Sequence, residues 1–288
     1  MRERGPCFVR PEHESGASLN GYVWCVARRS HRTTARVVGL VFGAVVFAAC
    51  VPIGPTAAEH AADYSEAHGS HVLLVRQFDS TVLERAAPDW GLDTPHRLAS
   101  GTKSFAGVLA IAAAEDGLLS LDELAADTLV EWRNDPRKSQ ITIRHLLRTR
   151  VFDRIGLTVG RWRRDSVGHP LLAAGAYLSA NGWVKFGALI AKRGAWNGEQ
   201  VLDAALVDEM LSPSPANPDY GLSWWLDPDP DDEVNPDPDD IPDDLVSAAG
   251  AGGQRLYVVP SRQVVVVRFS EDQTFVDATF LSLLFDAS

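Results

Sequence analysis

Apolar and polar residues along the chain follow two different periods, and each period predicts a different kind of element. Residues 56–67 are rich in alanine and lead to Gly69, a pattern that predicts a helix and its end. Residues 71–77 and 80–86, HVLLVRQ and STVLERA, are typical of two strands joined by a tight turn. From residue 103 to 116 an alanine-rich apolar run predicts a longer helix that a glycine ends.

The rest of the chain alternates between further helices and short strands. Helices are expected at residues 120–129, 142–150, 182–194, 201–213 and 275–286. Strands are expected at the aromatic residues 220–227 and in both arms of residues 254–270, which turn at residues 260–263. Because strands lie near both ends with helices between them, the pattern predicts an α+β fold. In it, one antiparallel sheet flanked by helices is shared by the two ends of the chain.

The first fifty residues have the pattern of an export signal. Four arginines between residues 28 and 36 precede an apolar stretch, residues 37–50, that is shorter than the ~20 residues needed to span a membrane. Its end, FAAC, resembles a bacterial lipoprotein signal, in which the cysteine, here Cys50, is lipidated. We therefore expect residues 1–50 to be a leader and residues 51–288 to be a domain exported to the cell envelope on a lipid anchor. An uncleaved anchor and plain secretion are the alternatives.

Composition argues against several partners and sites. The formal net charge of −11 argues against nucleic acid, because phosphate binding needs a basic surface. Much of this charge lies in residues 227–244, where ten acidic residues and repeated prolines predict a solvated loop rather than a calcium site. The cysteines Cys7, Cys25 and Cys50 precede the domain, so they supply it with neither a disulfide framework nor a zinc site.

Ser100 and Lys103 stand at the start of the long apolar helix, in the sequence Ser-Gly-Thr-Lys. A lysine three residues after a serine lies on the same helix face, so its amine can reach the hydroxyl. Backbone N–H groups at a helix start also stabilise a developing oxyanion. If apolar neighbours bury the amine, it loses its charge more readily and can act as a base. The alternative is a serine that caps the helix beside a solvated lysine.

Several segments together resemble one enzyme family. Residues 98–132, 177–202, 220–227 and 248–270 follow one another as the corresponding segments do in the serine β-lactamase-like hydrolases. This superfamily includes class C β-lactamases, DD-peptidases, esterases and amidases, and the chain is most similar to the branch of 6-aminohexanoate-dimer hydrolase. The resemblance covers residues 70–285.

The resemblance implies the roles of several residues. Ser100 corresponds to the nucleophile that becomes acylated, and Lys103 to its partner in proton transfer. Residues 250–254 correspond to the third motif, on a strand that faces the nucleophile, where Gly252, Gly253 and Gln254 would form the oxyanion and substrate strand. Ala251 stands where many relatives carry Lys or His, which argues against a working β-lactamase. The family needs no metal or organic cofactor, and the implied substrate is a small ester or amide.

One family motif is missing from the chain. Relatives carry Tyr-x-Asn or Ser-x-Asn after the segment that matches residues 142–150. In this chain, the segment that begins at residue 151 follows directly, although in relatives it lies many tens of residues further on. Residues 179–181, Ser-Ala-Asn, have the right letters but fall at a helix start. We therefore expect a truncated helical subdomain with apolar surface exposed near Val151 and Phe152.

Two functions follow from these observations. The first is a serine hydrolase that cleaves an ester or amide through an acyl-enzyme on Ser100. The second is a catalytically impaired family member that acts as a non-enzymatic binding lipoprotein. An unstable remnant is a third reading, and the acyl substrate and the oligomeric state stay open.

Overall fold

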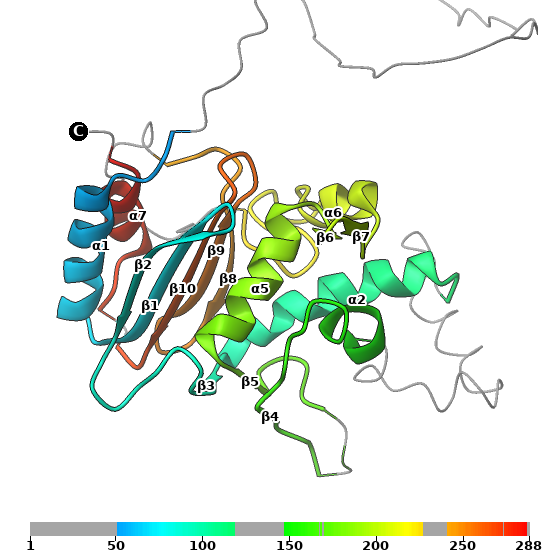
Figure 1. The fold of residues 1–288 in the computed structure, drawn as a ribbon. Coiled ribbons are helices and arrows are strands. Elements are labelled where there is room, and N and C mark those ends of the chain that lie inside the picture. Colours follow the sequence, from blue (N-terminus) through cyan, green and yellow to red (C-terminus); the bar gives the residue numbers. More distant parts are fainter. Residues whose placement is uncertain are drawn as a thin grey trace, which may run out of the picture. The chain divides into compact units, whose positions relative to one another are not determined.

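An antiparallel sheet that joins both ends of the domain is the centre of the computed structural model (Figure 1). The structure describes residues 51–118, 147–166, 168, 170–226, 241–272 and 274–286. The five strands lie in the order β2-β1-β10-β9-β8. Their bounds are β1 Ser70–Gln77, β2 Ser80–Ala86, β8 Val246–Gly250, β9 Gln254–Val259 and β10 Val264–Ser270. The predicted α+β fold, with one sheet shared by the two ends of the domain, is confirmed.

Both faces of the sheet are covered by helices. The four valines and the phenylalanine of β10 alternate between the two faces, and all are buried. Helices α1, Pro55–Ala67, and α7, Asp277–Phe285, cover one face, and α5, Ala180–Ala191, covers the other (Figure 1). Such two-sided burial explains why this strand begins with four consecutive valines.

The chain enters the domain at one end of the sheet and is held there by a single side chain. Gln77, the last residue of β1, accepts a hydrogen bond from Ile53 N at 2.9 Å and donates to Val51 O at 3.2 Å. Its amide also donates to Arg262 O in the β9–β10 turn, at 3.4 Å. Residues 51–53 are therefore fixed to this end of the sheet.

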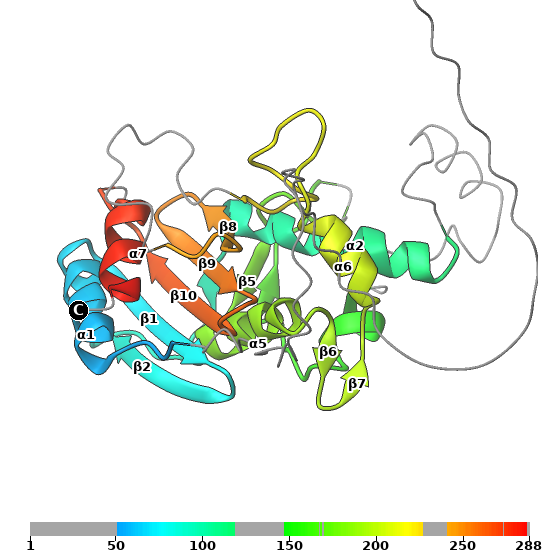
Figure 2. The ribbon, with the colours of Figure 1, turned by 90° about the horizontal axis from the view of Figure 1, so that it is seen from above.

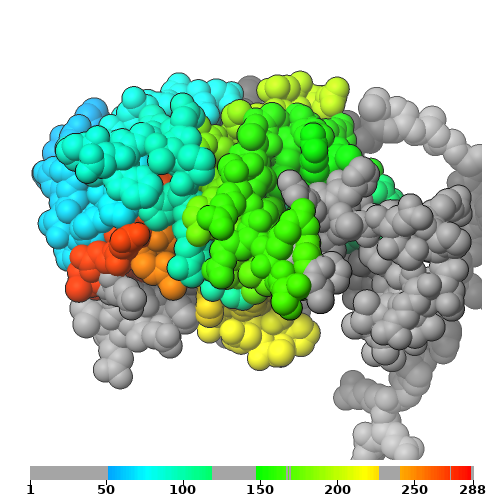
Figure 3. All heavy atoms as spheres, turned by 90° about the horizontal axis from the view of Figure 1, so that it is seen from below, coloured from blue at the N-terminus to red at the C-terminus, as the bar shows by residue number. Residues whose placement is uncertain are grey.

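Helix α2, Ser104–Glu115, follows a 3-10 turn, Ala99–Lys103, and lies beyond α5, with the short helix α6, Ala204–Met210, packed beside it (Figure 2). Short strands complete this half: β3 His96–Arg97, β4 Arg161–Trp162, β5 Ala176–Leu178, β6 Ala195–Trp196 and β7 Glu199–Gln200. Strand β3 pairs with β5, which brings the regions around residues 71–100 and 150–178 next to each other on one surface (Figure 3).

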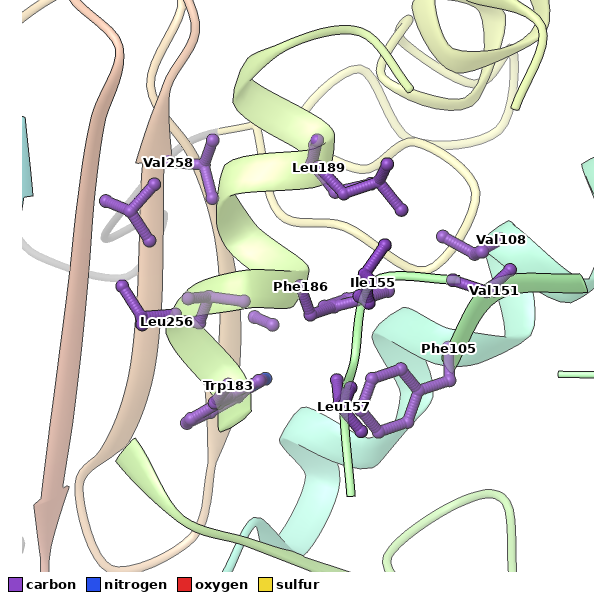
Figure 4. Packing of buried hydrophobic residues seen from close by; sticks show 14 of the residues in the cluster. Phe105, Val108, Val151, Ile155, Leu157, Trp183, Phe186, Leu189, Leu256 and Val258 are labelled. Carbon is purple, nitrogen blue, oxygen red and sulfur yellow. The ribbon is translucent and has the colours of Figure 1, made fainter. Parts of the chain in front are cut away.

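The expected apolar exposure near residue 151 is wrong. Val151 and Phe152 are 0% and 4% exposed, because the chain forms a π-helical turn, Arg148–Phe152, that directs them into the core. The Phe152 ring packs edge-to-face on Phe105 of α2, with ring centroids 5.3 Å apart. Figure 4 shows Val151 in the same cluster as Phe105 and Val108.

Arg150, in the same turn, connects three elements. Its guanidinium forms ion pairs with Glu115 at 2.6 Å and Asp116 at 2.7 Å, at the end of α2. The Glu115 carboxylate also accepts a hydrogen bond from Asp203 N, at the start of α6. The π-helical turn is therefore tied to its neighbours by charge as well as by burial.

The predicted aromatic strand at residues 220–227 is also wrong. Tyr220 and Trp225 form only an isolated bridge with each other, and Trp225 forms a second bridge with Ser247 of β8. Ser223 between them has φ +68°, a left-handed conformation that reverses the chain.

Several predictions lie outside the described residues. These are the leader and Cys50, the helix at 120–129, the first part of the helix at 142–150, and most of the acidic loop. No helix in the described ranges is long and apolar enough to cross a membrane.

Candidate active site

The turn that carries Ser100 is held on several sides. Leu98 N donates to Ala176 O of β5 at 3.0 Å, and the Thr102 hydroxyl donates to Ala99 O at 2.7 Å. Ala176 N in turn donates to the Thr102 hydroxyl at 3.2 Å. Ala99 has φ +49°, a conformation that costs energy for a residue with a side chain and that is found at functional sites. The residue before Ser100 is thus strained and firmly fixed.

Ser100 and Lys103 are brought together by this turn. Lys103 Nζ donates a hydrogen bond to Ser100 Oγ at 2.9 Å. Ser100 does not cap α2, because Lys103 occupies the N-cap position and no side chain caps this end. Lys103 is exposed, whereas the activation expected from the sequence would bury its amine among apolar neighbours.

Strand β8, at the edge of the sheet, lies directly against this turn. A Cβ atom on Gly250 would overlap the Leu98 carbonyl oxygen and would lie 3.1 Å from Gly101 N. Only glycine permits so close an approach between the two backbones. The edge strand and the serine are therefore positioned relative to each other by main-chain contact.

The hydrogen-bond pattern of β8 shows which N–H groups face this edge. Ser247 N donates to Trp225 O at 2.8 Å and Trp225 N donates to Ser247 O at 2.9 Å, on the side of β8 away from β9. Because such groups alternate along a strand, the N–H group of Ala249 lies on that same outer side, whereas Ala251 belongs to the turn that follows β8. A backbone N–H beside a serine nucleophile is the usual donor to a developing oxyanion.

Gly252, Gly253 and Gln254, the predicted oxyanion strand, are placed elsewhere. Gly252 and Gly253 have φ +84° and +74° and form the turn between β8 and β9. The Gln254 amide donates to Gly252 O at 3.1 Å and also to Ser270 O, while Gly253 O accepts from Arg268 at 2.8 Å. The structure thus brings Gly250 and Ala251 of the third motif to Ser100, and it directs the other three residues toward β10.

A cavity of about 420 Å³ opens in front of the pair. It is lined by Ser100, Lys103, Tyr220, Ser223, Trp225, Ala248, Ala249, Gly250, Ala251 and Arg255. Sequence reasoning singled out the first two of these residues and the end of β8. It missed the four polar or aromatic side chains of Tyr220, Ser223, Trp225 and Arg255. The only feature of the sequence that could have pointed to them is that they lie in two of the segments that resemble the family, residues 220–227 and 248–270.

Arg255 reaches the cavity from β9 but is already paired. Its Nε and Nη2 donate to both carboxylate oxygens of Asp277, at 2.6 and 2.7 Å, and its Nη1 donates to Gln254 O at 3.1 Å. Burial alone would lower the pKa of Arg255, but the Asp277 carboxylate outweighs it and raises this pKa. Arg255 therefore stays a cation, and the Asp277 carboxylate balances its charge.

Tyr220 and Trp225 form an aromatic wall. Their rings meet edge-to-face at 4.8 Å with an interplanar angle of 72°, a favourable aromatic geometry. Partial burial raises the pKa of Tyr220. The phenol is therefore in its neutral, protonated form at neutral pH.

The Ser-Ala-Asn segment has a structural part in the described chain. Ser179 caps α5 and accepts a hydrogen bond from Gly182 N at 3.0 Å. Asn181 donates to the Asp93 carboxylate at 2.8 Å. Within the described ranges, no group of three or more His, Cys, Asp or Glu side chains is placed to hold a metal ion.

Comparisons with known proteins agree with this fold. The sequence model of the Beta-lactamase family matches residues 57–151, and a search of curated proteins gives no match. Among solved structures, the "Putative 6-aminohexanoate-dimer hydrolase from Bacillus anthracis" is similar with a TM-score of 0.61 and 16% identity, over 78% of this chain and 80% of that one. A penicillin-binding protein homologue from Caulobacter crescentus has a TM-score of 0.60 and 13% identity, over 82% and 98% of the two chains. A class C β-lactamase from Rhodobacter sphaeroides has a TM-score of 0.55 and 16% identity, over 80% and 97%.

Proposed function

We propose that the chain is a serine β-lactamase-like hydrolase that cleaves an ester or amide through an acyl-enzyme on Ser100, a proposal supported by its fold and by the family match over residues 57–151. The observation that carries the proposal is the hydrogen bond of 2.9 Å between Lys103 Nζ and Ser100 Oγ, at a cavity bounded by the edge strand β8. A nucleophile, a proton acceptor and backbone donors are then gathered around one space.

The reaction follows from these positions. Ser100 Oγ bonds to the acyl carbon, and its proton passes to Lys103 Nζ when that amine is in its neutral form. The N–H groups of Ser100 and of Ala249, on the outer edge of β8, hold the negative oxygen that develops. Collapse of the tetrahedral intermediate releases the alcohol or amine, and water then hydrolyses the acyl-serine. In other enzymes, removal of one oxyanion-hole donor lowers the rate on the order of 10²–10³-fold, so the donors at this edge are expected to supply a large share of catalysis.

Active-site titration of the full chain tests this proposal. The protein is treated with a fluorophosphonate ester and, separately, with a labelled penicillin, and the adduct is located by intact and peptide mass. We expect one adduct per chain on Ser100 from at least one reagent. The adduct is expected to be absent in Ser100→Ala and present in Ser212→Ala, which removes an exposed hydroxyl on another element. A folded protein without an adduct would overturn the proposal and favour a scaffold that binds a ligand without chemistry.

Anchoring at the cell envelope is a separate proposal. It rests on the basic run, the apolar stretch and Cys50, all within the first fifty residues. Growth with a clickable palmitate analogue is expected to label the wild-type protein and not Cys50→Ser. Labelling of both variants, or of neither, would contradict lipidation at this cysteine.

A further inference from the structure

The alcohol or amine that leaves during acylation needs a proton donor. When the tetrahedral intermediate collapses, an alkoxide or amide anion leaves poorly unless it receives a proton as the bond breaks. Lys103 then holds the proton that came from Ser100, with which it is hydrogen-bonded at 2.9 Å. A donor on another wall of the cavity could protonate the leaving group while Lys103 keeps the proton that it took from Ser100.

Four other side chains with N–H or O–H groups line the cavity: Tyr220, Ser223, Trp225 and Arg255. Arg255 keeps its protons, because the Asp277 carboxylate pairs with the cation. The indole N–H of Trp225 can donate a hydrogen bond but cannot accept one, and the Ser223 hydroxyl is a far weaker acid than a phenol. Tyr220 is thus the side chain among them that can both give and take back a proton.

The loop that carries Tyr220 is fixed to both elements that build the serine site. Trp225, which packs on the Tyr220 ring, exchanges two backbone hydrogen bonds with Ser247 of β8, at 2.8 and 2.9 Å. On the other side, a Cβ atom on Gly107 of α2 would overlap the Leu222 carbonyl oxygen. The loop therefore lies in backbone contact with α2, the helix that continues from Lys103, and is held to the edge strand beside Ser100.

The backbone of Tyr220 is held as well. Its N–H donates to Asn217 O at 3.3 Å, and its carbonyl accepts from Ser214 N at 3.0 Å. Leu222 N donates to Met210 O at 2.8 Å, at the end of α6. A side chain with such fixed surroundings needs little reorganisation to act in a reaction.

We propose that Tyr220 is the general acid that protonates the leaving group and the general base of deacylation. This inference rests on the proposed function. In acylation, the Ser100 Oγ–carbon bond forms, the Ser100 proton goes to Lys103 Nζ, the bond to the leaving group breaks, and Tyr220 Oη gives that group its proton. In deacylation, water bonds to the acyl carbon and its proton goes to the Tyr220 phenolate. The Ser100–acyl bond then breaks, and Ser100 Oγ takes its proton back from Lys103.

Tyr220→Phe tests this assignment through the leaving group. Two esters of the same acid are compared: a p-nitrophenyl ester, whose leaving group needs no proton, and an alkyl ester, whose leaving group does. In Tyr220→Phe we expect kcat/KM, which reports acylation, to fall roughly 10²–10³-fold for the alkyl ester and less than about 3-fold for the p-nitrophenyl ester. We also expect a burst of p-nitrophenol followed by slow turnover, with the acyl adduct on Ser100 visible by mass.

A matched control removes a hydroxyl elsewhere. Tyr177→Phe alters a half-buried tyrosine on β5, in the small sheet with β3 and β4, and should leave both esters unchanged. Trp225→Leu loosens the packing of Tyr220 while keeping its hydroxyl, and is expected to reduce the alkyl-ester rate more than the p-nitrophenyl rate. This variant keeps the proposal testable if Tyr220→Phe is poorly folded.

The outcomes separate this inference from the proposed function. If Ser100 is acylated but Tyr220→Phe slows both esters equally, or neither, Tyr220 is not the acid and only this inference fails. If the wild-type protein forms no adduct on Ser100, the proposed function fails and the assignment of Tyr220 fails with it.

Discussion

Gly250 carries the strictest steric demand in the site. It allows the edge strand to touch the turn of Ser100, and any side chain there would overlap the Leu98 carbonyl oxygen. Relief of that overlap must move either β8 or the turn, and both movements separate Ser100 from the N–H groups that face it. The position of Ser100 thus depends on a main-chain contact that one added methyl group can disturb.

Gly250→Ala is therefore expected to affect stability and reactivity together. We predict a loss of about 1–3 kcal/mol in the free energy of unfolding, the usual cost of overpacking, and a rate of Ser100 labelling by fluorophosphonate at least 10-fold lower. Urea unfolding and labelling kinetics measure the two effects. Gly54→Ala is the control, because nothing lies within 4 Å of its added Cβ atom. Unchanged labelling in Gly250→Ala would show that the contact does not position the serine.

At the same scale, contacts between residues that lie close together along the chain could be predicted from the sequence better than contacts between distant segments. Ser100 and Lys103 come together because three residues make one turn of a helix, a local property. The third motif was displaced by a few residues, because the pattern of glycines does not say where the strand ends. Gly252 and Gly253 both have positive φ and belong to the turn, so the cavity receives the residues before them.

Among the elements, the π-helical turn Arg148–Phe152 is fixed to its neighbours by both burial and charge. It buries Val151 and Phe152, and it pairs Arg150 with Glu115 and Asp116 at the end of α2. Glu115 in turn accepts a hydrogen bond from Asp203 N at the start of α6. The Arg150 side chain is 30% exposed and that of Glu115 is 17% exposed, so water screens this pairing only in part.

Arg150→Met is expected to lower the free energy of unfolding by about 1–2 kcal/mol, between the values for exposed and buried ion pairs. The loss arises because Glu115 and Asp116 keep their charge without their partner. Urea unfolding measures it, and Arg148→Met is the comparison, because that side chain is 68% exposed and lies 3.4 Å from Asp153. Equal effects of the two substitutions would show that the junction does not depend on the Arg150 pairs.

The elements that the sequence predicted correctly are those with a self-contained pattern. Helices α1, α2, α5, α6 and α7 and strands β1, β2, β9 and β10 fall close to their expected ranges. Residues 220–227 do not form the expected strand, because Ser223 reverses the chain and Trp225 finds its partner on β8, beyond the acidic segment. No local pattern describes such a contact, which explains why Tyr220 and Trp225 were missed as cavity residues.

At the scale of the whole molecule, three distant segments meet around a pair of histidines. His96 on β3 is buried and stacks on Phe269 of β10 at 4.7 Å, and its Nε2 is 3.1 Å from Nδ1 of His71 on β1. The His71 ring stacks in turn on Trp90 at 4.6 Å. Burial lowers the pKa of His96, and the nearby His71 acts in the same direction, while the Arg97 carbonyl and Glu271 oppose the shift.

Stability is therefore expected to fall as the pH drops below about 6.5, the value for an unperturbed histidine. In that range the unfolded chain binds the proton more readily than the folded chain, so protons favour unfolding. The slope contributed by this group is at most about 1.4 kcal/mol per pH unit. Urea unfolding between pH 5 and 8 measures it, and His96→Gln should flatten the profile whereas His60→Gln, on the exposed side of α1, should not. An unchanged profile in His96→Gln would assign the acid sensitivity to other groups.

The hold of Gln77 on residues 51–53 decides how a tethered form of the domain would work. Gln77 and the β9–β10 turn mark one end of the sheet, whereas Ala251 and the cavity lie at the other end, roughly 15–20 Å away by the rise of strand β9. A tether attached just ahead of Val51 would have no flexible linker between it and the sheet. It would therefore hold the domain at a nearly constant distance from the attachment point. The cavity would then lie at the end of the sheet opposite the attachment point, at a distance that the length of the strands sets. The substrates within its reach would be those that come within that fixed distance of the attachment point.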